Sequence, residues 1–255
     1  MINIQHRRMH ALLERCLHSY PHNRSARSIC NSAKNYALPA DSVMYIFNRD
    51  TKLLQRERAA RTPDVKLALD LGCGRGHVSK YLSPDTIEEL VLADMSPSFV
   101  QQAETADGLK ASRMIMDEEN CSLEPNSLDL VISSLSLHWV NDLPGCFRSI
   151  NKSLRNDGVF MAAMFGGESL YELRSSLQLA EMERDGGISA HISPFADVRD
   201  IGSLLTRANF TMLTIDTDEI VIGYPSMFEL MWDLKGMAEN NAIRNRKLRL
   251  NKDTV

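Results

Sequence analysis

Asp70-Leu71-Gly72-Cys73-Gly74-Arg75-Gly76 is the stretch that decides the fold of this chain of 255 residues. The apolar run 67–71 leads into it, which is typical of a buried strand, and a helical pattern follows at 77–82. Glycines at alternate positions let the backbone turn sharply and come close to a bulky ligand, because a side chain there would collide with it. Backbone N–H groups at the start of the helix can then face an anionic ligand group. The stretch predicts a ligand-binding turn, although a tight strand-to-helix connection without a ligand has the same pattern.

Strands and helices alternate from residue 66 to residue 165. Apolar runs predict strands at 67–71, 90–94, 113–117, 128–134 and 159–165, and helical patterns predict helices at 77–82, 96–106 and 144–155. Ser96 and Pro97 supply an N-cap and a proline at the first helical position. Strands that alternate with helices of this length form βαβ units on a parallel sheet, and right-handed crossovers then leave one main option. We predict an α/β fold with a doubly wound, mostly parallel, Rossmann-like sheet.

The pattern changes after residue 165. Gly166 and Gly167 lead to a predicted helix at 169–184 and a loop at 186–196, and we interpret residues 166–196 as a lid insertion. A helix at 198–208, a strand region at 210–222 and a helix from residue 226 complete the pattern. No later stretch has a strand pattern, so we expect the sheet to lack its closing C-terminal strand and the strand at 210–222 to keep an unpaired edge.

Acidic residues follow the predicted strands at the edge where the glycine turn lies. Asp94 ends the second strand 24 residues after Asp70, close to the spacing expected of an acid that accepts hydrogen bonds from ribose hydroxyls. Asp117 and Glu118 end the third strand, where a carboxylate can receive an adenine amino group. Acids are also common at strand ends for other reasons. The glycine turn, Asp94 and the acids at 117–118 follow successive strands at one edge of the sheet, and together they nevertheless predict an adenosine-containing cofactor.

The glycine spacing decides between NAD and S-adenosylmethionine. The pattern G-x-G-x-x-G cradles a pyrophosphate, whereas here the glycines stand at positions 72, 74 and 76, and no second nucleotide-binding half follows. A methionine tail suits this turn better, so we predict S-adenosylmethionine. The predicted cofactor-binding residues are Asp70, Gly72, Gly74, Gly76, Asp94, Met95, Asp117, Glu118 and Ser134.

Catalytic residues are harder to assign from the sequence. His138, just past the fourth strand, could contact substrate or transfer a proton, or could simply form the pocket wall with Trp139. Glu168 and Glu172 follow the fifth strand and could pair with a guanidinium, although such acids more often form a solvated helix face. No histidine has an acidic residue two positions later, as iron sites with two histidines and one carboxylate commonly do, so we assign no metal ligands.

Charge is unevenly distributed along the chain. The net charge is −4, but residues 1–40 carry six basic residues and one acidic residue. Apolar residues recur there at helical spacing opposite an arginine-rich face, as in mitochondrial transit segments, and the apolar run of a secretory signal is missing. We predict that residues 1–40 direct the protein to the mitochondrial matrix. The alternative is a basic surface tail without a targeting role.

Several classes of protein are disfavoured by composition. No stretch approaches the ~20 apolar residues of a membrane span, so no transmembrane span is predicted. The acidic remainder of the chain disfavours nucleic acid as a partner. The five cysteines are scattered and form no C-x-x-C pair, which indicates neither a disulfide framework nor a structural zinc site.

Several motifs resemble known families. Residues 70–77, Asp-Leu-Gly-Cys-Gly-Arg-Gly-His, resemble the first motif of class I S-adenosylmethionine-dependent methyltransferases. Residues 133–143, Ser-Ser-Leu-Ser-Leu-His-Trp-Val-Asn-Asp-Leu, resemble the fourth-strand motif of malonyl carrier-protein methyltransferases and their relatives. Four further stretches, at 47–60, 164–174, 186–195 and 224–231, together resemble the mitochondrial complex I assembly factors described as arginine hydroxylases.

This resemblance implies a matrix protein with a methyltransferase fold that binds S-adenosylmethionine and hydroxylates an arginine of an iron–sulfur subunit of respiratory complex I. Asp70 and the three glycines match the family's cofactor turn, Asp94 its ribose position and Asp117 its adenine position. The partner would be that subunit, alone or within an assembly intermediate associated with the inner membrane.

The chain would then comprise a targeting segment at 1–40, a basic and helical segment at 41–64 and a methyltransferase-like domain at 65–255. Two other functions stay open. One is methyl transfer to a carboxylate or small molecule, and the other is a non-catalytic assembly chaperone.

Overall fold

The computed structural model describes residues 40–48, 65–184, 186–187, 191–236 and 239. The predicted targeting segment therefore lies, apart from its last residue, outside the described residues. The same holds for residues 49–64 of the segment that we expected to be basic and helical.

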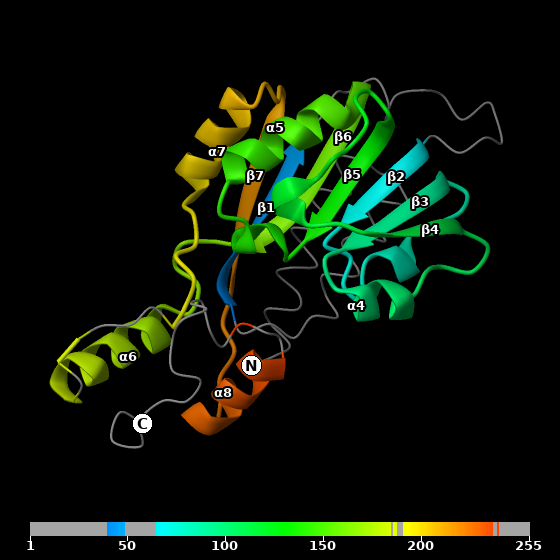
Figure 1. Ribbon diagram of the computed structural model, residues 1–255. Coiled ribbons are helices and arrows are strands. Elements are labelled where there is room, and N and C mark those ends of the chain that lie inside the picture. The colour runs from blue at the N-terminus through cyan, green and yellow to red at the C-terminus, as the bar shows by residue number, and fades with distance from the viewer. Residues whose placement is uncertain (1–39, 49–64, 185, 188–190, 237–238, 240–255) are drawn as a thin grey trace.

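Within the described residues, seven strands form one sheet in the order β4-β3-β2-β5-β6-β1-β7 (Figure 1). Its members are β1 (Ala40–Asn48), β2 (Val65–Leu71), β3 (Ile87–Asp94), β4 (Lys110–Ile115), β5 (Leu128–Ser134), β6 (Leu154–Phe165) and β7 (Leu213–Ile220). The pairs β2–β3, β3–β4, β2–β5 and β5–β6 are parallel. The predicted doubly wound, mostly parallel α/β fold is confirmed.

The strand order places a topological switch point between β2 and β5. From β2 the chain proceeds outward through β3 to β4, and it then returns to start the other half of the sheet with β5 and β6. Ligands of open α/β sheets bind at such a point, beyond the carboxyl ends of the strands. The glycine turn follows β2 directly, so the fold puts it where a ligand is expected.

Helices connect and cover the strands. The α-helices are α4 (Pro97–Gln102), α5 (Leu143–Ser153), α6 (Tyr171–Arg184), α7 (Val198–Arg207) and α8 (Met227–Gly236), and the short 3-10 turns are η1 (Ser79–Tyr81), η2 (Glu118–Asn120) and η3 (Leu137–Trp139). Helices α5 and α7 contact one another, α5 contacts β6 and α7 contacts β7. Helices α6 and α8 lie away from the main body of the sheet, toward the bottom of the view (Figure 1). No helix among the described residues is long and apolar enough to cross a membrane.

Two apolar cores lie on opposite faces of the sheet because side chains alternate along each strand. Leu69, Leu71 and Val131 pack with Phe147 of α5 and Leu205 of α7 on one face. On the other face, the core contains strand residues together with residues around η1 and after α4: Ala68, Leu90, Leu92, Leu130, Ile132, Val78, Leu82, Ala103 and Leu109. Asp70 lies in the middle of this parallel sheet, and its neighbours in β2 are completely buried.

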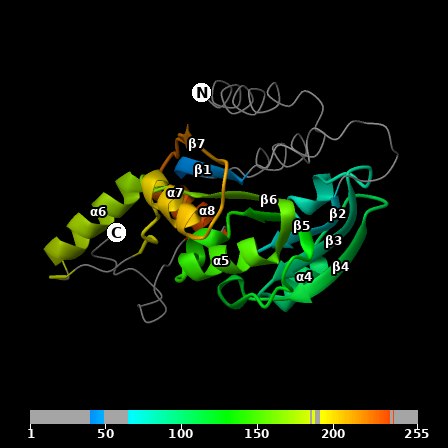
Figure 2. The ribbon, with the colours of Figure 1, turned by 90° about the horizontal axis from the view of Figure 1, so that it is seen from above.

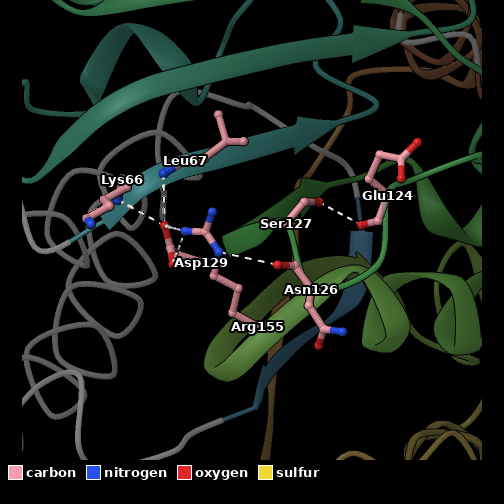
Figure 3. A network of polar contacts seen from close by, with 7 residues as sticks. All are labelled: Lys66, Leu67, Glu124, Asn126, Ser127, Asp129 and Arg155. Atoms are coloured by element: carbon pink, nitrogen blue, oxygen red, sulfur yellow. Dashed lines mark hydrogen bonds and ion pairs between the residues drawn. The ribbon is translucent and has the colours of Figure 1, made fainter.

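A polar network joins three strands at their amino ends, at the edge of the sheet opposite the glycine turn (Figure 3). Oδ2 of Asp129 in β5 accepts hydrogen bonds from the backbone N–H groups of Lys66 and Leu67 in β2, at 3.1 and 3.0 Å. The Arg155 guanidinium of β6 lies 2.9 Å from the same carboxylate. One acid therefore links β2, β5 and β6 at the end away from the glycine turn.

Strand β1 takes the position for which we found no C-terminal strand. We expected the strand region 210–222 to keep an unpaired edge; β7 stands last in the strand order of the described residues and pairs antiparallel with β1, from Ala40 opposite Ile220 to Asn48 opposite Leu213. Strand β1 also pairs antiparallel with β6. Figure 2 shows β1 and β7 at the end of the sheet away from β4. The N-terminal side of the chain thus supplies a strand in the position where we looked for one from the C-terminus.

Strand β1 corrects the expectation of helix for residues 41–48 of the segment 41–64, since these residues are extended. Val43, Tyr45, Ile46 and Phe47 are β-branched or aromatic, and such residues favour strands. Their sequence was compatible with a strand, but the partners that stabilise it lie more than a hundred residues away.

The structure corrects one local prediction and confirms another. The expected helix at 77–82 is reduced to the single 3-10 turn η1, because Gly76 adopts a positive φ of 81° and the chain becomes extended again at Leu82. Ser96 is the N-cap residue of α4 and Pro97 its first residue, as predicted, but the Ser96 side chain makes no capping hydrogen bond. Its backbone N–H instead donates to Asp94 Oδ1 at 2.8 Å.

Candidate functional site

The glycine turn after β2 leaves room at one position only. A Cβ atom on Gly72 would lie 2.3 Å from Oγ of Ser136, and one on Gly76 would lie 2.1 Å from the backbone oxygen of Glu104. A Cβ atom on Gly74 would meet no atom within 4 Å. Gly72 and Gly76 are therefore required by packing, whereas Gly74 exposes its backbone to open space. That exposed backbone is the kind of surface that a ligand can touch closely.

Asp94 links the glycine turn to the end of β3. Its Oδ2 accepts a hydrogen bond from Gly74 N–H at 2.8 Å, and its Oδ1 accepts one from Ser96 N–H, also at 2.8 Å. The residue is buried. Each carboxylate oxygen can accept more than one hydrogen bond, so both retain capacity for the hydroxyl groups of a ribose. The contacts also hold the carboxylate in one orientation before any ligand arrives.

Asp70 is a buried carboxyl group whose two oxygens have no hydrogen-bond partner among the described residues. Burial, and then the neighbouring Asp94 carboxylate, raises its pKa to about 7. Oγ of Ser133, one strand away in β5, is buried too and has no hydrogen-bond partner in the part of the chain that the structure describes. Buried polar groups normally find partners, and orphaned ones occur at sites that bind something. These groups and the open backbone of Gly74 fit a polar ligand that carries positive charge.

The other predicted cofactor-binding residues lie at the same edge. Asp117 caps η2 by accepting a hydrogen bond from Glu119 N–H at 2.9 Å. Glu118 is buried, and its Oε1 accepts a hydrogen bond from Ser136 next to Gly72. Met95 follows Asp94 with 60% of its surface exposed, and the half-buried Ser134 ends β5. The structure therefore gathers acids, open backbone and an apolar side chain at the switch point, which is a donor and acceptor set suited to an adenosine and a methionine chain.

The thiol in the glycine turn is not a nucleophile. Burial, and then the Asp70 and Asp94 carboxylates, raises the pKa of Cys73, because a thiolate there would lie in an apolar and negatively charged environment. The thiol stays protonated and serves as a small apolar group in the core.

His138 lies in η3, immediately beyond the end of β5, and its side chain is fully buried. Its Nε2 lies 2.8 Å from Oε1 of Glu239, and the same oxygen accepts a hydrogen bond from Trp139 Nε1 at 3.1 Å. The imidazole ring packs 4.7 Å from the Phe165 ring and 5.6 Å from the Phe195 ring, measured between centroids. His138 is thus the one predicted catalytic residue that the described structure encloses in a polar contact.

Glu168 and Glu172, the other two catalytic candidates, are exposed around the start of α6. No hydrogen bond joins either side chain to the residues named above. A role for them in guanidinium binding stays a prediction.

Two acids were missed by the sequence reasoning. Glu239 contacts His138 across 101 positions of sequence, and no local pattern indicates such a contact. Glu181 in α6 pairs with His191, and both side chains are buried. The signal available for the second pair was a histidine in the loop after an amphipathic helix, which we noted only as part of a lid.

Over the described ranges, no three His, Cys, Asp or Glu side chains are arranged to hold a metal ion.

Known proteins resemble this chain in sequence. The family of methyltransferase domains matches residues 69–162. The mitochondrial arginine-hydroxylase NDUFAF5 of Danio rerio is 53% identical over 189 residues, which cover 74% of this chain and 59% of the fish protein. NDUFAF5 of Homo sapiens is 44% identical over 258 aligned positions, covering 91% of this chain and 74% of the human protein. A malonyl-[acyl-carrier protein] O-methyltransferase of a Methylovorus species is 31% identical over 211 positions, covering 76% of this chain and 69% of that enzyme.

Proposed function

This chain belongs to the family of the mitochondrial arginine-hydroxylase NDUFAF5, and we propose that it acts in mitochondria as an S-adenosylmethionine-binding arginine hydroxylase in the assembly of respiratory complex I. The observation that carries the proposal is the 44% identity to the human protein over nine tenths of this chain. The chain spans only 59% of the zebrafish relative, so the whole protein's activity is part of the proposal. The substrate we propose is an arginine of an iron–sulfur subunit in the mitochondrial matrix.

Different residues at the switch point would bind different parts of the cofactor. Asp94 would accept hydrogen bonds from the ribose hydroxyls, and Asp117 from the adenine amino group, with Met95 against the adenine ring. Asp70 would supply a buried negative charge close to the open backbone of Gly74. S-adenosylmethionine itself supplies a positively charged sulfonium that carries a transferable methyl group. A cationic ligand is favoured here because Asp70 and Asp94 are both buried acids.

Hydroxylation places a further demand on the protein. Inserting one oxygen atom into a C–H bond of arginine removes two electrons from the substrate. With dioxygen as the oxidant, the second oxygen atom leaves as water after taking two electrons from a reductant and two protons. The chain's own contribution is to bind the arginine and to exclude water from the cofactor edge.

Methyl transfer is the second candidate function. It is favoured by the methyltransferase domain over residues 69–162 and by the 31% identity to a carrier-protein O-methyltransferase. In that reaction a carboxylate or another nucleophile would take the methyl group from the sulfonium. The same cofactor site would serve both functions, so cofactor binding does not distinguish them.

Mass spectrometry of the iron–sulfur subunits of complex I, isolated from cells with and without this protein, tests the proposal. A gain of one oxygen atom on an arginine supports hydroxylation, and a gain of one CH₂ group supports methyl transfer instead. No change in mass would favour a non-catalytic assembly role. Cells that carry Asp94→Ala should lose the modification, whereas Asp107→Ala, at an exposed acid of the same domain, should retain it.

A further inference from the structure

Glu239, the third residue beyond helix α8, contacts residues at the cofactor edge of the sheet. Glu239 is buried, and its Oε1 contacts both His138 Nε2 and Trp139 Nε1 at the end of β5. Its backbone N–H donates to the carbonyl of Leu234 at 2.9 Å, so its position follows from the end of α8. A C-terminal acid thereby becomes part of a site whose other members follow β5 and β6.

Helix α8 is held in place by a small apolar cluster. Leu234 packs with Leu170 at the start of α6 and with Ile192 in the loop that follows it. Leu230 and Phe195 lie against the same cluster. This packing places Glu239 next to His138, and the Phe195 ring also packs 5.4 Å from the Phe165 ring at the end of β6. The position of the carboxylate therefore depends on α6, its loop and α8 together.

The contact with Glu239 decides which nitrogen of His138 carries the proton. A carboxylate only accepts hydrogen bonds, so Nε2 must be the protonated nitrogen that donates to it. Nδ1 is buried and has no partner among the described residues. In that tautomer Nδ1 is a hydrogen-bond acceptor, and none of the described residues donates to it.

The surroundings of that acceptor suit one kind of ligand. The Glu239 carboxyl group places an acid beside the imidazole and the Trp139 indole. The rings of Phe165 and Phe195 pack around the imidazole, and Trp139 beside it is 40% exposed, so the aromatic group extends to the surface. A guanidinium is planar, weakly hydrated and positively charged, it stacks on aromatic rings, and its N–H groups donate to acceptors in its plane.

We propose that His138 Nδ1 and the aromatic rings around it bind the guanidinium of the substrate arginine, and that Glu239 is the positioning residue that fixes the tautomer of His138. This inference rests on the proposed function for the identity of the substrate. The inference concerns an arginine-binding subsite, and binding to that subsite can be measured without catalytic turnover. The carboxylate acts through the imidazole and does not touch the reacting atoms.

Nitrogen NMR of histidine-labelled full-length protein is the direct test. The spectrum of the ligand-free protein should show His138 protonated at Nε2 and bare at Nδ1. Addition of Nα-acetyl-L-arginine amide should shift the Nδ1 resonance, because that nitrogen gains a hydrogen bond. The citrulline analogue has the same shape without the charge and should leave the resonance almost unchanged. A ring protonated at Nδ1, or an equal response to both probes, would overturn the proposal.

Two substitutions of His138 separate its two nitrogens. His138→Gln keeps a donor near the Nε2 position for Glu239 but removes the Nδ1 acceptor, and it should weaken binding of the arginine probe by at least about tenfold. His138→Asn keeps an acceptor near the Nδ1 position but cannot reach Glu239, and it should bind the probe more tightly than His138→Gln. The reverse order of affinities would contradict the assignment.

Glu239→Gln tests the positioning role. An amide can donate as well as accept, so the His138 resonances should show both tautomers instead of one, and probe affinity should fall. The matched control is Glu124→Gln at an exposed position, which should change neither. A single unchanged tautomer in Glu239→Gln would exclude the role. The outcome is independent of the mass-spectrometric test, because the probe can bind whether or not an oxygen atom is later inserted.

Discussion

The sheet half of the chain, residues 65–165, and the segment formed by α6, its loop and α8 are built in different ways. The sheet half buries two large apolar cores, and its strands pair with neighbours that follow closely in sequence. Among its described residues, the other segment has a cluster of three buried apolar residues, while large apolar side chains on its helices are exposed: Leu179, Met182, Phe228 and Trp232. Because apolar burial is the main stabilising term, the first region should tolerate the loss of a contact and the second should depend on a few.

The candidate site lies across this divide. The predicted cofactor residues come from the stable sheet half, and His138 with its acid is completed by the less buried segment. The proposed cofactor site thus belongs to the region with the larger apolar cores, and the proposed arginine subsite also depends on the region with the smaller one. Substitutions that damage one half and spare the other can test this division.

The largest effect is expected at Gly76. A methyl group there would overlap the Glu104 backbone, and φ is 81°, so Gly76→Ala should lower the free energy of unfolding by about 4 kcal/mol or more. Gly74→Ala meets open space and should cost only about 1–2 kcal/mol, yet it should weaken S-adenosylmethionine binding. Urea unfolding and calorimetric titration measure the two quantities. Equal destabilisation by both substitutions would contradict the geometry of the turn.

Asp70 should make the sheet half sensitive to pH. Its pKa rises from 3.8 to about 7 on folding, so between these values the folded state binds more protons and stability falls as the pH rises. Above about pH 7 the Asp70 carboxyl group ionises in the folded protein, and the stability that its protonated form contributes is lost. Asp70→Asn should therefore stabilise the ligand-free protein at about pH 8, by at most roughly 4 kcal/mol, with a smaller gain near pH 4.

Denaturant unfolding at the two pH values provides the measurement. Asp85→Asn, at an exposed acid, serves as the control and should show no such difference. A gain from Asp70→Asn that did not depend on pH would show that the carboxyl group does not titrate in this range.

Asp94→Ala should affect the ligand more than the fold. Removing charge-assisted hydrogen bonds to ribose costs roughly 1.5–3 kcal/mol, a ten- to hundredfold loss of affinity. Calorimetric titration with S-adenosylmethionine is the measurement. An unchanged affinity would remove Asp94 from the cofactor site.

Asp129→Ala tests the end of the sheet away from the ligand. It leaves two backbone N–H groups and Arg155 without their acceptor, and should cost about 1–2 kcal/mol of stability. Cofactor affinity should stay within about twofold, since the network lies at the amino ends of the strands. A large loss of affinity would mean that the two ends of the sheet are coupled.

The smallest effect is expected on α8. Trp232 is 76% exposed, and Trp232→Ser should change the free energy of unfolding by less than about 0.5 kcal/mol. Leu234→Ala, two residues later on the buried side, should release the helix and with it the Glu239 contact. Loss of the single His138 tautomer in Leu234→Ala but not in Trp232→Ser would confirm how the acid is held.

The sequence allowed prediction where structure depends on near neighbours. Strand β5 was predicted with its observed bounds, and the helices at 143–153 and 198–207 were placed within two residues. The prediction of a helix at 77–82 was wrong because the positive φ of Gly76 and the contact of this turn with Glu104 shorten the helix. Neither feature can be recognised from the neighbouring sequence. Strand β1 was not predicted for a related reason, since its partners β6 and β7 lie far along the chain.

The sequence by itself determined the alternation of strands and helices, the glycine turn at the end of β2 and the acids at the strand ends, because each follows from residue type and spacing along a short stretch. Only the tertiary structure decided that β1 pairs with β7, that the oxygens of Asp70 have no hydrogen-bond partner among the described residues, and that Glu239 contacts His138. These depend on which distant segments meet in space. A side chain gains or loses a hydrogen-bond partner only when that packing is complete.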